Sequence, residues 1–189
     1  MIGAALIVML ASLASAPAGN QSQSGPRCQT KNDGNLTITC NFTPTPHAAR
    51  GSRRDSPVAV TRAVVALEPD EESILSAELT FTNTSAKPIG DAREVYLAID
   101  DEWGNNYVRR VLPHVDFRKL SPGTPLTFSE KLRVARFPPG HYTIQLWIPD
   151  PDPALKFNPA HNFLLSSAGV ANPSTGLNVV GRFAVERDR

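Results

Sequence analysis

The sequence lacks the features that support long helices. Its 189 residues include 17 prolines and 12 glycines, and no segment keeps apolar residues at a period of 3.6 for long. Proline removes a backbone donor and glycine is a poor helix former, so both types interrupt helices. We therefore expect short strands joined by turns, with a single helical turn near residues 116–120.

An excess of one charge is also missing. The 19 basic residues nearly balance the 18 acidic ones, which leaves a net charge of +1. Binding to nucleic acid requires a concentrated basic surface, so we do not expect a nucleic-acid partner. The length suits about one domain, and a hydrophobic fraction of 41% is enough for a core.

Long apolar runs are missing beyond the N-terminus. The run from Ile2 to Ala14 is shorter than the roughly 20 residues that a membrane-spanning helix needs. Small residues at Ala16 and Ala18 then match the pattern of a signal-peptidase site. We therefore predict a signal peptide over residues 1–18 and a secreted, extracellular protein without a membrane contact after cleavage. The alternative is an uncleaved membrane anchor.

Cysteine is scarce, with only Cys28 and Cys40 in the chain. Asn32-Asp33-Gly34 between them is a strong hairpin-turn signal, and the residues after it alternate in polarity. We predict a disulfide that closes this hairpin within residues 19–42, as an oxidising compartment allows. The alternative, a metal or redox pair, would call for C-x-x-C spacing or a nearby histidine.

Motifs for catalysis and metal binding are missing as well. The sequence contains no G-x-S-x-G, H-x-H or H-E-x-x-H, and its four histidines stand singly. Acidic residues cluster at 100–102 and 150–152, where Ca²⁺ or a glycosidase-like carboxylate pair is the alternative to solvated turns. We expect turns, and predict no catalytic residue, no metal and no cofactor. A small hydrolase using Asp100, Asp101 or Asp150 is the less favoured reading.

A linker is predicted over residues 43–57. Alternating prolines stiffen its first half, and residues 50–54 (RGSRR) make its second half basic. That basic stretch fits either a furin-like processing site or a plain solvated linker. Three N-glycosylation patterns begin at Asn35, Asn41 and Asn83, and each is equally well explained by Thr-rich strands.

The remaining residues, 58–189, carry the pattern of an all-β domain. The clearest strand follows Pro139-Gly140, where Tyr142, Ile144 and Leu146 fall on one face. Spacing of this kind predicts an antiparallel, two-layer, immunoglobulin-like β-sandwich with little helix, whose strand order the sequence leaves open. The expected strands are 58–67, 74–83, 94–100, 107–112, 126–134, 141–149, 163–165 and 178–185.

Four segments within this domain resemble a known family. They are residues 79–83, 95–100, 136–151 and 176–181, and together they resemble the C-terminal β-sandwich of domain-of-unknown-function family 4832. In that family the sandwich usually follows a glycoside-hydrolase-like (β/α)₈ barrel. We expect no barrel here, since only some 40 mature residues would precede the domain. The resemblance thus implies an accessory module without catalytic carboxylates, and a separately encoded barrel enzyme as one type of partner.

Aromatic residues outside the core pattern are the candidates for binding. Trp147 shares its strand face with polar residues, Trp103 lies in the turn expected at residues 101–106, and Tyr107 begins the strand after it. Exposed aromatic rings stack on sugars, so we expect these three residues to bind extracellular carbohydrate. This ligand assignment rests on analogy of fold and family. The alternatives are that a loop covers Trp147, and that the domain serves protein interaction or a structural role.

Overall fold

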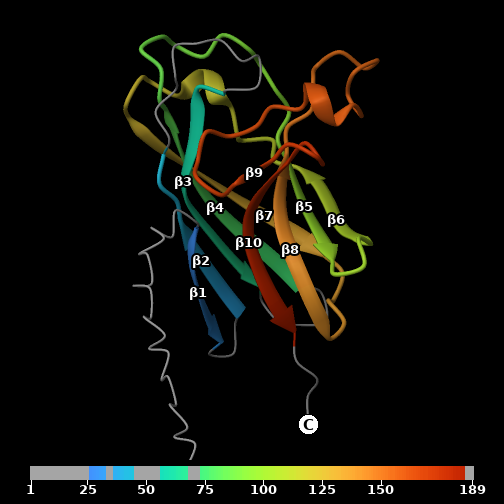
Figure 1. Cartoon of the computed structure of the whole chain (residues 1–189). Helices are drawn as coiled ribbons and strands as arrows, with labels where there is room; N and C mark the ends of the chain where they lie inside the picture. Colours follow the sequence, from blue (N-terminus) through green and yellow to red (C-terminus); the bar gives the residue numbers. More distant parts are fainter. Residues whose placement is uncertain (1–25, 33–35, 45–55, 68–72, 186–189) are drawn as a thin grey trace, which may run out of the picture.

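The computed structural model describes residues 26–32, 36–44, 56–67 and 73–185. Two antiparallel five-stranded sheets pack face to face (Figure 1), with strand orders β1-β2-β3-β4-β7 and β6-β5-β8-β10-β9. The predicted all-β, antiparallel two-layer sandwich is therefore confirmed. The strands are β1 (Arg27–Asn32), β2 (Leu36–Asn41), β3 (Val58–Leu67), β4 (Ser73–Asn83), β5 (Tyr96–Asp101), β6 (Asn106–Val111), β7 (Pro125–Val134), β8 (Gly140–Trp147), β9 (Ala171–Asn172) and β10 (Leu177–Val185).

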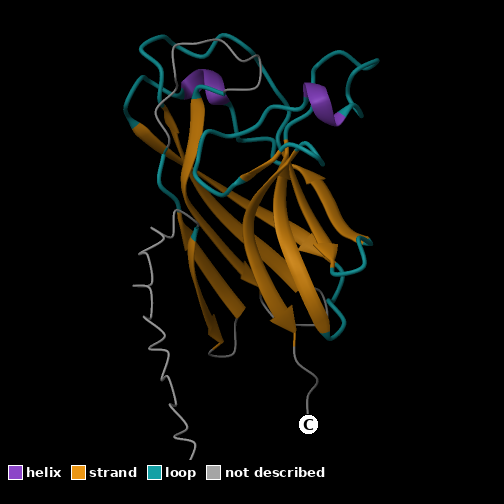
Figure 2. Cartoon of the chain, viewed as in Figure 1, coloured by secondary structure: helices purple, strands orange, loops and turns teal. Residues whose placement is uncertain are grey.

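Helix is limited to two short 3₁₀ turns in the described residues, both at the same end of the sandwich (Figure 2). The first, η1 (Phe117–Lys119), confirms the helical turn expected near residues 116–120. Asp116 caps it by accepting a hydrogen bond from the Arg118 backbone at 3.0 Å. The second, η2 (Pro159–His161), begins with proline after the cap residue Asn158. None of the described helical segments is long and apolar enough to cross a membrane.

The core lies between the two sheets and follows the alternation of the strands. On β8, Tyr142, Ile144 and Leu146 are buried against the first sheet, as predicted from their common face. Phe81 of β4 meets them from the opposite layer and contacts Phe117 edge to face, with ring centroids 5.2 Å apart. The η1 turn therefore supplies an aromatic side chain that closes one end of the core.

The cysteine hairpin is part of the first sheet. Cys28 of β1 and Cys40 of β2 lie directly opposite each other and form the predicted disulfide. Strand β2 also pairs with β3 over six residue pairs, and its Ile38 and Cys40 are buried in the core. Residues 19–42 thus do not stand apart from the sandwich where they are described. The expected signal peptide and most of the expected linker lie outside the described residues, as does Asn35.

The segment expected to be a strand at residues 163–165 is irregular, and the short strand β9 forms farther along the chain. The backbone of residues 163–165 forms separate hydrogen bonds to different partners instead of a strand ladder. Phe163 donates to the Ile148 carbonyl at 2.8 Å, and Leu165 donates to the Asn178 side chain at 2.7 Å. Apolar periodicity alone cannot separate such a buried, singly bonded segment from a strand.

The Gly176-x-Asn178 end of the predicted motif has a structural role. Gly176 has a φ of +68°, and a Cβ there would lie 2.6 Å from Asn162 Nδ2 and 2.7 Å from the Pro159 carbonyl oxygen. Asn178 is fully buried, and its amide donates to the carbonyls of Leu146 (3.2 Å) and Phe163 (3.0 Å). These two residues fasten the loop after β8 onto the second sheet.

The structure shows that two of the three N-glycosylation patterns differ in exposure. Asn83 is fully buried, and its Nδ2 donates to the carbonyls of Lys87 (2.8 Å) and Leu120 (3.4 Å). A glycan on that nitrogen would have to break both bonds and enter the core, so the folded chain excludes it. Asn41 lies exposed at the end of β2.

Candidate functional site

The three aromatic residues singled out from the sequence do not form one platform. Trp147 pairs with Tyr96 at the start of β5, whereas Trp103 lies in the β5–β6 turn at the other end of that strand and Tyr107 lies near the start of β6. The Asp101 pair lies five residues along β5 from the Tyr96 pair, which is about 17 Å at roughly 3.3 Å per residue. The chain therefore has two aromatic sites at opposite ends of the second sheet.

Trp147 lies on the outer face of the second sheet, the side turned away from the first sheet, and it is covered. Only 7% of the residue is exposed. Phe157 stacks on it with ring centroids 5.7 Å apart, and Tyr96 contacts it at 4.8 Å. The expectation that Trp147 is exposed for binding is therefore wrong, and the alternative that a loop covers it agrees with the structure. It also adds Phe157, which is 77% exposed and follows a Pro- and Asp-rich stretch without a periodic pattern.

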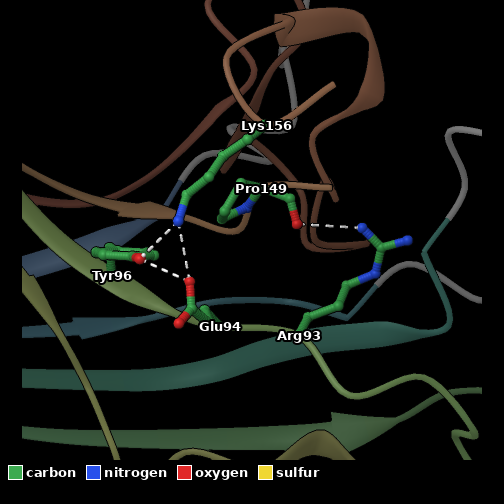
Figure 3. Close-up of polar contacts among 5 residues, drawn as sticks. All are labelled: Arg93, Glu94, Tyr96, Pro149 and Lys156. Carbon is green, nitrogen blue, oxygen red and sulfur yellow. Dashed lines mark hydrogen bonds and ion pairs between the residues drawn. The ribbon is translucent and has the colours of Figure 1, made fainter. Parts of the chain in front are cut away.

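A polar triad holds the segment that carries Phe157 (Figure 3). Lys156 Nζ donates to the Tyr96 hydroxyl at 3.0 Å and to Glu94 Oε2 at 3.1 Å, and the same hydroxyl donates to Glu94 at 2.6 Å. Hydrogen bonds from Tyr96 and Lys156 lower the pKa of Glu94, and the bonds to Tyr96 and Glu94 raise the pKa of Lys156. The triad therefore favours the charged forms of both Glu94 and Lys156.

A second cation fastens the start of the same segment. Arg93 donates from Nη1 to the carbonyl of Pro149 at 3.3 Å, as Figure 3 shows. Its guanidinium also lies over the ring of Phe163 at 5.0 Å from the centroid. Residues 149–157 are thus held at both ends, which fixes Phe157 over Trp147.

Amide and carboxylate groups lie next to this aromatic cluster on the outer face. Asp100 accepts from Asn106 Nδ2 at 2.6 Å and from Gln145 Nε2 at 2.8 Å. Ala98 lies between Tyr96 and Asp100 on the same face of β5, two residues from each, and is fully buried. Beside it, Arg109 reaches over the Trp147 ring at 5.2 Å. Below, the cluster of Tyr96, Trp147, Phe157, Lys156, Arg109, Asp100 and Gln145 is called the outer-face site.

The other aromatic site closes the opposite end of the core. Tyr142 contacts Tyr107, Phe137 and Phe183, with ring centroids 5.0 to 5.3 Å away. Its hydroxyl donates to the Pro138 carbonyl at 2.7 Å, and burial, aided by Tyr107 and Asp101, raises its pKa to about 12. Tyr107 remains 40% exposed and Trp103 81% exposed, so these two predicted residues are open to a partner.

The acidic clusters serve as turn residues, as the sequence favoured. Asp101 accepts from the backbone of Trp103 (2.9 Å) and Asn105 (2.7 Å). Asp150 and Asp152 each accept from the backbone two residues ahead, at 2.9 Å. Within the described ranges, no group of three His, Cys, Asp or Glu residues is placed to hold a metal ion.

A buried acidic residue that the sequence did not single out lies on β7. Glu130 occupies a position on the core-facing side of this edge strand and is 6% exposed. It accepts from the His114 backbone at 2.8 Å, and its other oxygen lies 2.9 Å from His114 Nδ1. The pair ties the loop after β6 to the first sheet. The signal in the sequence is the alternation along β7, which places Glu130 on the same face as Phe128 and Leu132.

No family model matches this chain, and no curated protein or solved structure matches it significantly. The resemblance to domain-of-unknown-function family 4832 therefore stays a prediction from the sequence.

Proposed function

We propose that the protein is a secreted, non-catalytic module that binds extracellular carbohydrate through the outer-face site. The observation that supports this most is the exposed ring of Phe157, held flat on Trp147 beside side chains that donate and accept hydrogen bonds. Sugar rings have apolar faces and hydroxyl edges, so an aromatic surface next to fixed polar groups suits them.

The rigidity of this site supports binding. Tyr96 is held by Glu94 and Lys156, and Gln145 is held by Asp100. Side chains that are already fixed lose little freedom when a ligand binds, which favours affinity. The Trp147 indole then acts as the support under Phe157 and does not itself present a face to the sugar.

The roles of the acidic residues support a non-catalytic assignment. Asp101, Asp150 and Asp152 hold turns, and Asp100 bonds to two amides. Asp100 pairs with Thr143 near the middle of β8, whereas Asp150 follows the end of that strand, so the two carboxylates come from different parts of the second sheet. Secretion is supported by the Cys28–Cys40 disulfide, because disulfides persist in oxidising compartments.

The experiment is a binding measurement against a panel of soluble and insoluble polysaccharides. The protein starting after residue 18 is compared with Phe157→Ala and with Trp103→Ala, which removes an exposed aromatic residue at the opposite end of the sheet. We expect Phe157→Ala to abolish binding and Trp103→Ala to retain it. The proposal fails if no polysaccharide binds, or if both variants bind like the parent.

A second candidate function is protein interaction at the edge strand β6. Three of the four exposed large hydrophobic residues in the described chain, Trp103, Tyr107 and Val111, lie on the β5–β6 hairpin. Strand β6 also ends its sheet, so an extended segment of a partner could add to it. This function predicts a partner whose binding is lost in Val111→Lys and unaffected by Phe157→Ala.

A further inference from the structure

One side chain of the outer-face site, Arg109, indicates the chemical class of the ligand. It belongs to β6 and pairs across the ladder with Ala98 of β5. Because Ala98 has only a methyl group, the arginine side chain can cross β5 and place its guanidinium over the Trp147 ring, 5.2 Å from the centroid. The guanidinium is thus brought over the same indole that the exposed Phe157 stacks on.

Arg109 differs from the other cation of the site in its partners. Lys156 is neutralised by Glu94 at 3.1 Å. Arg109 contacts the indole, and none of the carboxylates in the described ranges lies within ion-pair distance of it. The nearby Asp100 carboxylate is engaged on both oxygens by Asn106 and Gln145. Among the described residues, the Arg109 guanidinium therefore contacts an aromatic face and forms no ion pair.

A guanidinium in this position is suited to an acidic ligand group. It is planar, always charged at physiological pH, and presents paired N–H donors that match the two oxygens of a carboxylate. A guanidinium that lies over an indole loses part of its hydration on that side and keeps N–H donors for a ligand. A carboxylate bound there would lie over the indole that also supports the Phe157 ring, on which a sugar can stack.

We propose that the glycan recognised by this protein is a uronic-acid polysaccharide, and that Arg109 binds its carboxylate. This inference rests on the proposed carbohydrate-binding function and adds the class of ligand and the residue that selects it. Arg109 then distinguishes acidic from neutral sugars, while Phe157 supplies the stacking that both would share.

The test uses polygalacturonate, alginate and hyaluronate, each compared with its own methyl ester, so that only the carboxylate charge changes. The matched control for Arg109→Gln is Arg110→Gln, which removes the same charge from the next residue of β6. Arg110 is also exposed, and it donates to the Arg109 carbonyl at 3.3 Å. An Arg109→Lys variant keeps the charge and loses the planar donor pair. Thermal unfolding of each variant checks that the fold is retained.

We expect the parent and Arg110→Gln to bind at least one free-acid polymer about tenfold or more tightly than its ester, as one well-formed charged contact provides. Arg109→Gln should lose this preference, and Arg109→Lys should keep a part of it. Equal binding of acid and ester by the parent overturns the inference, as does an equal loss in both glutamine variants. In either case, binding that still depends on Phe157 leaves the proposed function standing. Absence of binding to all the polymers, charged and neutral, overturns both.

Discussion

Phe157 lies nearly parallel to Trp147, with their planes 25° apart and their centroids separated by 5.7 Å. Removing the phenyl ring in Phe157→Ala should expose the indole to water. In a Trp103→Phe background, where Trp147 is the sole tryptophan, we expect its emission to shift to longer wavelength and acrylamide quenching to increase. Global stability should fall by no more than about 1.5 kcal/mol, the scale of one aromatic pair. An unchanged spectrum would mean that Phe157 does not shield the indole in solution.

The Glu94–Tyr96–Lys156 triad predicts a wide pH range over which residues 149–157 stay fastened. The lowered pKa of Glu94 means that its contribution is present above the ordinary value of 4.5 and lost as pH falls through the shifted one. The raised pKa of Lys156 means that its contribution is present below 10.5 and lost as pH rises further. Quenching of Trp147 in the Trp103→Phe background should therefore be constant between these limits and rise outside them.

A matched variant tests whether Glu94 causes the rise in Trp147 quenching at low pH, called here the acid limb. Glu94→Gln keeps the size of the side chain and removes its charge, so quenching should no longer rise as the pH falls below 4.5. The alkaline limb, which depends on the Lys156–Tyr96 bond as well, should remain. Persistence of the acid limb in Glu94→Gln would assign it to another group.

Tyr142 should titrate later than an ordinary tyrosine. Burial raises its pKa from 10.0 to about 12, so its neutral form stabilises the folded state below pH 10 and that contribution is lost as pH rises toward 12. Absorbance of phenolate at 295 nm should show a late step that disappears in Tyr142→Phe and remains in Tyr107→Phe. A late step in both variants would show that another tyrosine is responsible.

Gly176 and Gly123 allow backbone conformation to be separated from close packing. Both have positive φ, +68° and +71°, so alanine at either position costs about 1–2 kcal/mol of backbone strain. Only at Gly176 would the new Cβ meet the Pro159 backbone below 3.0 Å, whereas the space around Gly123 is open. Urea unfolding should show that Gly176→Ala lowers the free energy of unfolding by about 1–3 kcal/mol more than Gly123→Ala does, which is the range for overpacking. Equal losses would show that the loop after β8 yields to the added methyl group.

The parts of the fold that depend on local pattern could be predicted from the sequence. Strand β3 matches the expected residues 58–67, and the turn signal at residues 32–34 placed Cys28 opposite Cys40. Alternation along one strand and the chemistry of one turn are local properties, so neighbouring residues alone report them. The order of the strands is set by contacts between distant segments and left no comparable trace.

The outer-face site was predicted only in part for the same reason. Trp147 could be placed on its strand face, but its cover comes from Phe157 in a loop and from Arg109 two strands away. The apolar run at residues 163–165 predicts a strand. Their hydrogen bonds in fact run to Asn178 and Ile148, partners that no local pattern identifies.

The pairing of β2 with β3 determines what a proteolytic cut in the basic stretch at residues 50–54 would produce. Both cysteines lie before that stretch, so the disulfide would join the N-terminal fragment only to itself. Six backbone pairs and the buried Ile38 and Cys40 side chains would still hold this fragment in the first sheet. A nicked protein would therefore migrate as one species under native conditions and as two in denaturant, without any reductant.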